Sequence, residues 1–250
     1  MNTTNPNILI GCVTYPGHAY ALKQLVQSID LFDVEKGTAI DLVFADNSTD
    51  NFYSKQLQQL TIRGKHPQVL HDPGEARTRI DKIIDGRNKI REFFLKNKQY
   101  THLFFLDSDV ICPKQTITEL LKMDHALACG VYLGHVQIPN GEKRIVPIAY
   151  GFHKEGKVRQ FIMKDIVEKK VVKIASAGLG CVLIRRDVFE TAQPIVFRNI
   201  GSSTTGGEDV AFYKDTREQG FDLFLNTTIR CDHVVFPEGN ENNKFFKLRK

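Results

Sequence analysis

The N-terminal half of the chain alternates between short apolar runs and longer stretches that repeat with the period of a helix. Residues 7–13 and 40–45 are nearly continuous apolar runs of strand length, which is typical of strands buried on both faces. Between them, apolar residues fall on one helical face, at Leu22, Leu25, Ile29 and Phe32. A second helical pattern covers residues 76–98, where Gly86 either divides the helix or marks its start. This order predicts a parallel, doubly wound sheet.

A third apolar run, residues 103–106, ends in Asp107, Ser108 and Asp109. Ligands of open α/β sheets gather at the carboxyl ends of strands, so these carboxylates are expected at the rim of a crevice. Two carboxylates one residue apart can hold a hard divalent cation, and that cation can hold a diphosphate. The same residues also favour a turn before a helix, so the residues alone leave both interpretations open.

The C-terminal half predicts shorter strands joined by tight turns such as Asn140-Gly141 and Glu155-Gly156. The expected strands cover residues 126–133, 144–151, 158–163, 171–175, 181–184, 221–225 and 228–235, and the expected helices cover 117–123, a segment from about 186, and 208–220. We therefore expect antiparallel additions to the sheet. With no repeat or linker in the sequence, the prediction is one domain over residues 1–236 and a basic tail over residues 237–250.

Composition narrows the class of ligand. The chain has 250 residues, of which 42% are hydrophobic and 25% charged, and a formal net charge of +5, as in an ordinary globular α/β domain. The mildly basic balance suits a phosphate-bearing ligand. No arginine-rich run or zinc-finger spacing occurs, which argues against nucleic acid as a partner.

Cysteine usage and hydropathy predict the compartment. The cysteines are odd in number and scattered, at Cys12, Cys112, Cys129, Cys181 and Cys231, which is typical of reduced core residues in a cytoplasmic protein. Because no run of about 18 apolar residues occurs, we expect a soluble protein. Phe245 and Phe246 lie among lysines, so the tail either contacts an anionic membrane surface or is disordered.

Four features in this order resemble the GT-A class of nucleotide-sugar glycosyltransferases. They are the turn at residues 46–50, Gly86-Arg87-Asn88, Asp107-Ser108-Asp109, and Gly207-Glu208-Asp209. The resemblance covers about residues 7–236 and is greatest to the large inverting family with a DxD motif. It implies a Rossmann-like, mostly parallel sheet flanked by helices, a UDP- or GDP-sugar donor, Mn²⁺ or Mg²⁺, and transfer of a hexosyl group to a hydroxyl of a glycan, lipid-linked or small-molecule acceptor.

The resemblance also implies a role for each matching residue. Residues 1–110 would form the donor-binding half, with Thr14 and Tyr15 at the base and ribose and Asp46 accepting hydrogen bonds from either. Arg87 would lie beside the diphosphate. Asp107 and Ser108 would contact the donor, and the metal would be held by Asp109, Asp107 and His233.

The acceptor half, residues 111–236, would supply the catalytic groups. Asp209 would take the proton of the acceptor hydroxyl, with Glu208 in support, and transfer would invert the anomeric centre without a covalent intermediate. The small residues that would admit the acceptor are Ala177, Gly178, Leu179 and Gly180. The alternative is that Glu208 and Asp209 are only acids favoured at a helix N-terminus.

Two departures from the family pattern keep other functions open. The turn after the second strand reads Ala45-Asp46-Asn47 instead of a double acid, and the chain has no Trp to stack on an acceptor. An apolar strand that ends in Asp-x-Asp also fits a phosphohydrolase or phosphotransferase in which Asp107 is the nucleophile. A non-catalytic module that binds nucleotide sugars is the third alternative.

Overall fold

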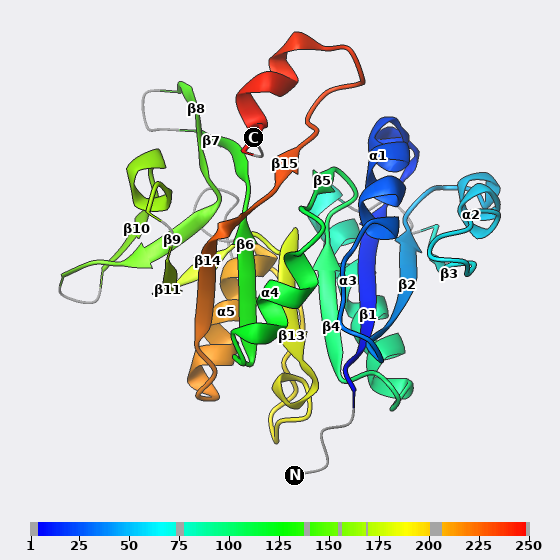
Figure 1. Ribbon diagram of the computed structural model, residues 1–250, viewed down its shortest axis with the longest axis horizontal. Helices are drawn as coiled ribbons and strands as arrows, with labels where there is room; N and C mark the ends of the chain where they lie inside the picture. The colour runs from blue at the N-terminus through cyan, green and yellow to red at the C-terminus, as the bar shows by residue number, and fades with distance from the viewer. Residues whose placement is uncertain are drawn as a thin grey trace.

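The centre of the protein is an eight-stranded sheet with helices on both faces (Figure 1). The computed structural model describes residues 5–73, 78–137, 141–154, 157–168, 170–200 and 207–248. In spatial order, the strands are β11 (Val171–Ile174), β14 (Leu223–Arg230), β6 (Leu127–Val131), β13 (Cys181–Arg185), β4 (His102–Leu106), β1 (Asn7–Thr14), β2 (Ala39–Asp46) and β3 (Gln68–His71). The apolar runs seen in the sequence thus become neighbouring central strands.

The N-terminal half of this sheet is parallel and the C-terminal half is mixed. β3, β2, β1 and β4 pair in parallel, whereas β13 runs antiparallel between β4 and β6. Smaller antiparallel sheets are formed by β10 (Val158–Gln160), β9 (Ala149–Phe152) and β12 (Ser176–Ala177), by β15 (Asp232–His233) and β5 (Val110–Ile111), and by β7 (Leu133–Gln137) and β8 (Lys143–Pro147). The predicted α/β fold, mostly parallel with antiparallel additions, is confirmed.

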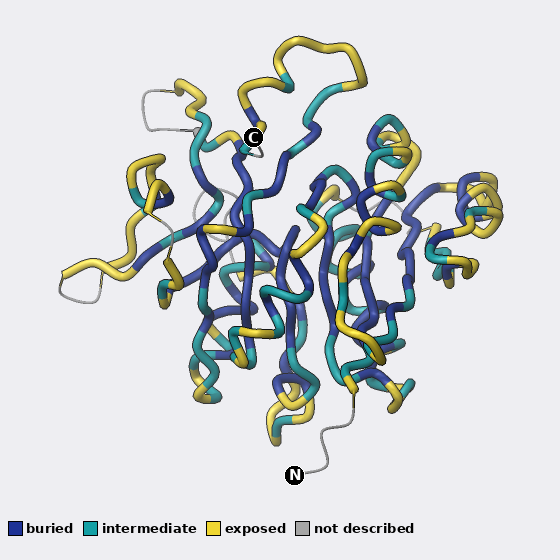
Figure 2. The backbone as a smooth tube through the Cα atoms, viewed as in Figure 1, coloured by how far each residue is buried: buried dark blue, intermediate teal, exposed yellow. Residues whose placement is uncertain are grey.

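Side-chain alternation along each strand produces two hydrophobic layers. Ile8 and Ile10 of β1 contribute to the layer under α1 (Ala19–Asp30), α2 (Phe52–Gln58) and α4 (Thr116–Lys122). Leu9 contributes to the opposite layer, under α3 (Arg79–Lys96) and α5 (Glu208–Glu218). Because both faces are covered, the central strands are buried along most of their length (Figure 2).

Some expected boundaries were wrong, for physical reasons. Gly86 lies inside α3 and neither divides nor starts it. The expected helix near residue 186 is one 3-10 turn, η4 (Arg186–Val188), because Arg186 instead donates to the carbonyls of Phe94 and Asn97 at the end of α3. The two expected final strands are one strand, β14, followed by β15. Thr227 does not break β14, because its N–H donates to the Lys170 carbonyl.

Part of the predicted turns and loops, namely Asn140, Glu155-Gly156 and residues 201–206, lies outside the described residues. Other 3-10 helices within the described residues include η1 (Pro16–His18), η3 (Met163–Ile166) and η5 (Glu241–Phe246). Among the described residues, no helix combines the length and apolar character needed to cross a bilayer.

The predicted basic tail folds back onto the domain. Phe246, at the end of η5, is 1% exposed and its ring lies 4.9 Å from that of His135 and 6.1 Å from that of His233. Phe245 is 53% exposed. Only one of the two tail phenylalanines therefore faces solvent, and membrane contact by this tail stays a prediction.

The approach of α3 to β1 generates the first testable prediction. A Cβ added at Gly86 would lie 2.8 Å from Cγ1 of Val13, so Gly86→Val forces the helix away from the sheet. Overpacking of this kind should lower the free energy of unfolding by about 1–3 kcal/mol, measured by denaturant titration. Glu92→Val, on the exposed face of the same helix, is the control and should change it by less than about 0.5 kcal/mol. Equal losses in the two variants would contradict a packing role for Gly86.

Candidate active site

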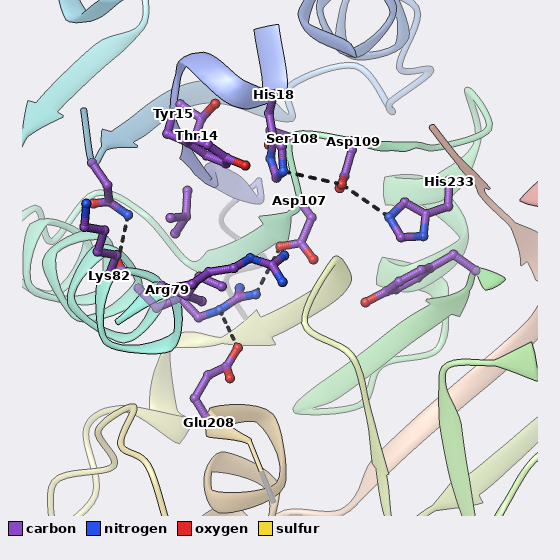
Figure 3. Close-up of a pocket in the computed structure, with 15 residues that line it drawn as sticks. Thr14, Tyr15, His18, Arg79, Lys82, Asp107, Ser108, Asp109, Glu208 and His233 are labelled. Atoms are coloured by element: carbon purple, nitrogen blue, oxygen red, sulfur yellow. Dashed lines mark hydrogen bonds and ion pairs between the residues drawn. The ribbon is translucent and has the colours of Figure 1, made fainter. Parts of the chain in front are cut away.

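A cavity of about 500 Å³ opens at the carboxyl ends of β1, β2 and β4 (Figure 3). This is the edge of the sheet at which the sequence predicted a crevice. The lining residues come mainly from the strand ends, η1 and α3, and are Val13, Thr14, Tyr15, His18, Asn47, Arg79, Lys82, Ile83, Arg87, Asp107, Ser108, Asp109, Tyr132, Glu208 and His233.

A buried arginine joins two carboxylates on the wall of this cavity. Arg87, on α3, is 4% exposed, and its Nη2 donates to Oδ1 of Asp107 at 3.0 Å. Its Nε lies 3.5 Å from Oε1 of Glu208. Burial alone would lower the pKa of Arg87, but the charges of Asp107 and Glu208 outweigh burial and raise it. The cavity therefore holds a fixed cation, as recognition of a diphosphate requires.

A carboxylate and two histidines form a second polar group (Figure 3). Oδ2 of Asp109 lies 3.3 Å from Nε2 of His233 and 4.0 Å from Nε2 of His18. Nδ1 of His233 is 2.8 Å from the Leu133 carbonyl, and Nδ1 of His18 is 2.7 Å from Oγ of Ser108. Each imidazole thus has one nitrogen oriented by a neighbour and the other turned to Asp109.

The pair of Asp109 and His233 stabilises a charge-separated state. Burial would raise the pKa of Asp109, but the hydrogen bond and charge of His233, with the charge of His18, lower it overall. Burial would lower the pKa of His233, and Asp109 raises it overall. Each group of this pair thus favours the charged form of the other.

These donors suit Mn²⁺ or Mg²⁺ in kind, because carboxylate oxygens bind hard ions and imidazole is a ligand for Mn²⁺. The carbonyl behind His233 is the type of partner that orients a metal-bound imidazole. Asp107 faces Arg87, however. Within the described ranges, only the thiols of Cys112, Cys181 and Cys231 place three ligand atoms within 4.8 Å of one another. A third ligand for an ion at Asp109 and His233 would therefore require reorientation of Asp107 or His18.

The other residues predicted to bind the sugar donor differ in whether they line the cavity. Thr14, Tyr15 and Ser108 line the cavity. Asp46 is fully buried, and its carboxylate accepts from the N–H of Ser48 at 3.0 Å, from its hydroxyl at 2.7 Å and from the hydroxyl of Ser54 at 2.5 Å. Asp46 is not among the lining residues. Its role as an acceptor for the base or ribose stays a prediction.

The acidic pair lies at the N-terminus of α5. Glu208 lines the cavity and pairs with Arg87, whereas Asp209 accepts from the N–H of Val210 at 2.7 Å and is not part of the lining. Burial, and then the charge of Glu208, raise the pKa of Asp209 to about 6. With this pKa, Asp209 can exchange a proton near neutral pH.

The expected acceptor loop packs beneath the cavity. Ala177 and Leu179 are each 2% exposed or less, and the carbonyl of Gly180 accepts from the N–H of Asp107 at 3.2 Å. The N–H of Gly178 donates to the Ile148 carbonyl. Of the four loop residues, Gly180 therefore contacts Asp107 directly, and the predicted contact of this loop with an acceptor remains untested.

Sequence reasoning missed five polar or charged lining residues, namely His18, Asn47, Arg79, Lys82 and Tyr132, and the apolar Val13 and Ile83. Arg79 and Lys82 lie in the first turns of α3, ahead of Arg87, so their spacing on that helix was a usable signal. His18 follows the end of β1 by a few residues, which was a weaker signal. Nothing in the local sequence separates Tyr132 from an ordinary core tyrosine.

No protein-family model matches the chain, and no curated protein matches it. Solved structures do. GalNAc-T7, solved with UDP, GalNAc and Mn²⁺, matches 96% of this chain and 45% of its own at 15% identity, with a TM-score of 0.61. S. aureus TarS matches 88% and 34% at 16% identity (TM-score 0.53), and A197 from STIV matches 92% and 86% at 13% identity (TM-score 0.52).

These neighbours are glycosyltransferases, and the likeness shows that the chain has a GT-A-like fold. Identities this low show the fold alone. This chain also spans less than half of the length of the GalNAc-T7 chain and about a third of that of the TarS chain.

Removal of Arg87 provides the test of the buried ion pairs. Arg87→Met leaves Asp107 and Glu208 without their shared cation, which should lower the free energy of unfolding by about 3–5 kcal/mol. Arg91→Met is the matched control, because Arg91 is also buried on α3 but its guanidinium lies over the Phe189 ring, at 5.8 Å. Denaturant titration of both variants should show the larger loss at Arg87, and equal losses would refute the ion-pair account.

Proposed function

We propose that the chain is a metal-dependent glycosyltransferase that moves a hexosyl group from a UDP- or GDP-linked sugar to an acceptor hydroxyl. The observation that carries the proposal is that a buried cation, Arg87, and a carboxylate–imidazole pair, Asp109 and His233, face the same cavity. One group suits the phosphates and the other an ion that bridges them. The fold of the neighbours, including one solved with UDP, GalNAc and Mn²⁺, supports this assignment.

The donor would lie between β1 and α3. Thr14 and Tyr15 would contact the base and ribose, with Asn47 adjacent, and Asp46 would hold that turn in place through Ser48. Arg87 would bind the diphosphate, and Asp107 and Ser108 the ribose or sugar.

Asp109 and His233, joined by Asp107 or His18, would hold Mn²⁺ or Mg²⁺. When bound, the ion supplies charge stabilisation of the leaving diphosphate. The residues of this chain would supply charge and orientation. Arg87 would place a fixed positive charge next to the same phosphates, and Leu133 and Ser108 orient the imidazoles of His233 and His18.

Asp209 is the proposed base of an inverting reaction. Glu208 pairs with Arg87 and would act as a supporting group, while Asp209 has a raised pKa, as a base that works near neutral pH requires. The acceptor hydroxyl would approach from the side of residues 177–180 and give its proton to Asp209.

The five buried thiols fit a reducing, cytoplasmic setting.

A thermal-shift screen tests the donor and metal assignments together. UDP or GDP, or their sugars, should raise the melting temperature only with Mn²⁺ or Mg²⁺ present, with a stabilisation of about 2.7 kcal/mol at 100 times the dissociation constant. His233→Ala should remove the ion-dependent part, and His66→Ala, at an exposed histidine before β3, should not. A response to phosphosugars but to no nucleotide would contradict the proposal and favour the phosphohydrolase.

The base assignment predicts a pH profile. Protonated Asp209 cannot accept a proton, so kcat/KM should be constant above about pH 6 and fall as the pH drops below it. Asp209→Asn should reduce kcat by about 10²–10⁴-fold with donor affinity unchanged. Asp215→Asn is the control, because Asp215 lies on the same helix as Asp209 but forms a salt bridge to Arg198. Unchanged turnover in Asp209→Asn would exclude this residue as the base.

A further inference from the structure

Three buried cysteines meet beneath the candidate active site. Sγ of Cys112 lies 3.3 Å from Sγ of Cys231 and 3.7 Å from Sγ of Cys181, and all three sulfurs are within 4.8 Å of one another. The three side chains are at most 2% exposed. We name this group the cysteine trio.

The trio joins segments that are far apart in the sequence. β5 and β15 pair antiparallel, with Ile111 opposite Asp232, so the register continued by one residue sets Cys112 opposite Cys231. Cys181 is the first residue of β13, which pairs with β4 and β6. The three cysteines thus lie at the ends of β5, β15 and β13, which belong to distant parts of the sequence.

The spacing of the sulfurs matches a metal site. A Zn²⁺ ion about 2.3 Å from each sulfur sets the sulfur–sulfur distances at about 3.8 Å in tetrahedral and 4.0 Å in trigonal geometry. The distances of 3.3 and 3.7 Å are reached from these by small side-chain rotations. Gly130 makes room for this group, because a Cβ there would lie 2.9 Å from Sγ of Cys181.

We propose that the cysteine trio binds one Zn²⁺ ion as a structural centre separate from the ion proposed at Asp109 and His233. Sulfur ligands select soft ions, and carboxylates select hard ones such as Mg²⁺. Binding releases thiol protons to solvent. The ligating sulfurs are thiolates, and Zn²⁺ offsets two of their three negative charges within the apolar core around the trio.

The site would hold the strands that carry the catalytic groups. Cys112 follows Asp109 by three residues, Cys231 precedes His233 by two, and Cys181 directly follows the Gly180 carbonyl that accepts from Asp107. Because the trio is buried, the ion would enter as the chain folds. This inference does not depend on the proposed transferase activity.

Refolding with metal tests the site. The reduced chain is refolded with equimolar Zn²⁺ and excess Mg²⁺, desalted, and its zinc counted by plasma mass spectrometry. About one zinc per chain is expected for the native sequence, and a near-complete loss for Cys112→Ala, Cys181→Ala and Cys231→Ala. Cys129→Ala is the matched control and should keep its zinc, because Cys129 is equally buried on β6 but outside the trio. Zinc absent from the native chain, or retained in all three trio variants, overturns the proposal.

A second measurement covers trio variants that fail to fold. X-ray absorption at the zinc edge of the unmodified chain should show a sulfur shell at about 2.3 Å. A shell of nitrogen and oxygen alone would place the zinc at Asp109 and His233 and overturn the trio site. A Cys112–Cys231 disulfide in the purified chain, without zinc uptake after reduction, would do the same.

Discussion

The buried guanidinium of Arg87 is the constraint on which the candidate site depends. It extends from α3 to Asp107 at the end of β4 and to Glu208 at the start of α5. A charge in the core is tolerated only where opposite charges offset its lost hydration, so these three elements are fixed relative to one another. Gly86 determines how deeply the Arg87 guanidinium is buried, because it lets α3 lie close to β1. The packing of α3 against β1 therefore also determines the geometry of the candidate site.

The fold was predictable because its signals are local. The strands β1, β2 and β4 are buried on both faces, so each is an apolar run, and each ends in polar residues at the same edge of the sheet. That edge is why Asp107 and Asp109 could be placed at the cavity from sequence, whereas Thr14 was placed there through the family resemblance. The boundary errors at β14 and η4 involve groups whose hydrogen-bond partners are distant in the sequence, namely the backbone N–H of Thr227 and the side chain of Arg186.

The rest of the site was not predictable, since it depends on tertiary partners. Asp46 has the same strand-end position as Asp107, yet Ser48 and Ser54 occupy its carboxylate while Arg87 leaves Asp107 at the cavity wall. Phe246 illustrates the same point for the tail. Its composition predicts a surface segment, but packing against His135 and His233 places it behind a candidate metal ligand.

The paired strands β5 and β15 show how one scaffold could keep two metals apart. Asp109 and His233 offer oxygen and nitrogen at the open rim, and Cys112 and Cys231 offer sulfur in the core a few residues away. An ion at Asp109 and His233 would lie at the cavity wall, where it could exchange with solvent. A sulfur-bound ion has no such exit without unfolding. On the proposed assignments, exposure as well as ligand softness therefore separates an exchangeable cofactor from a permanent structural ion.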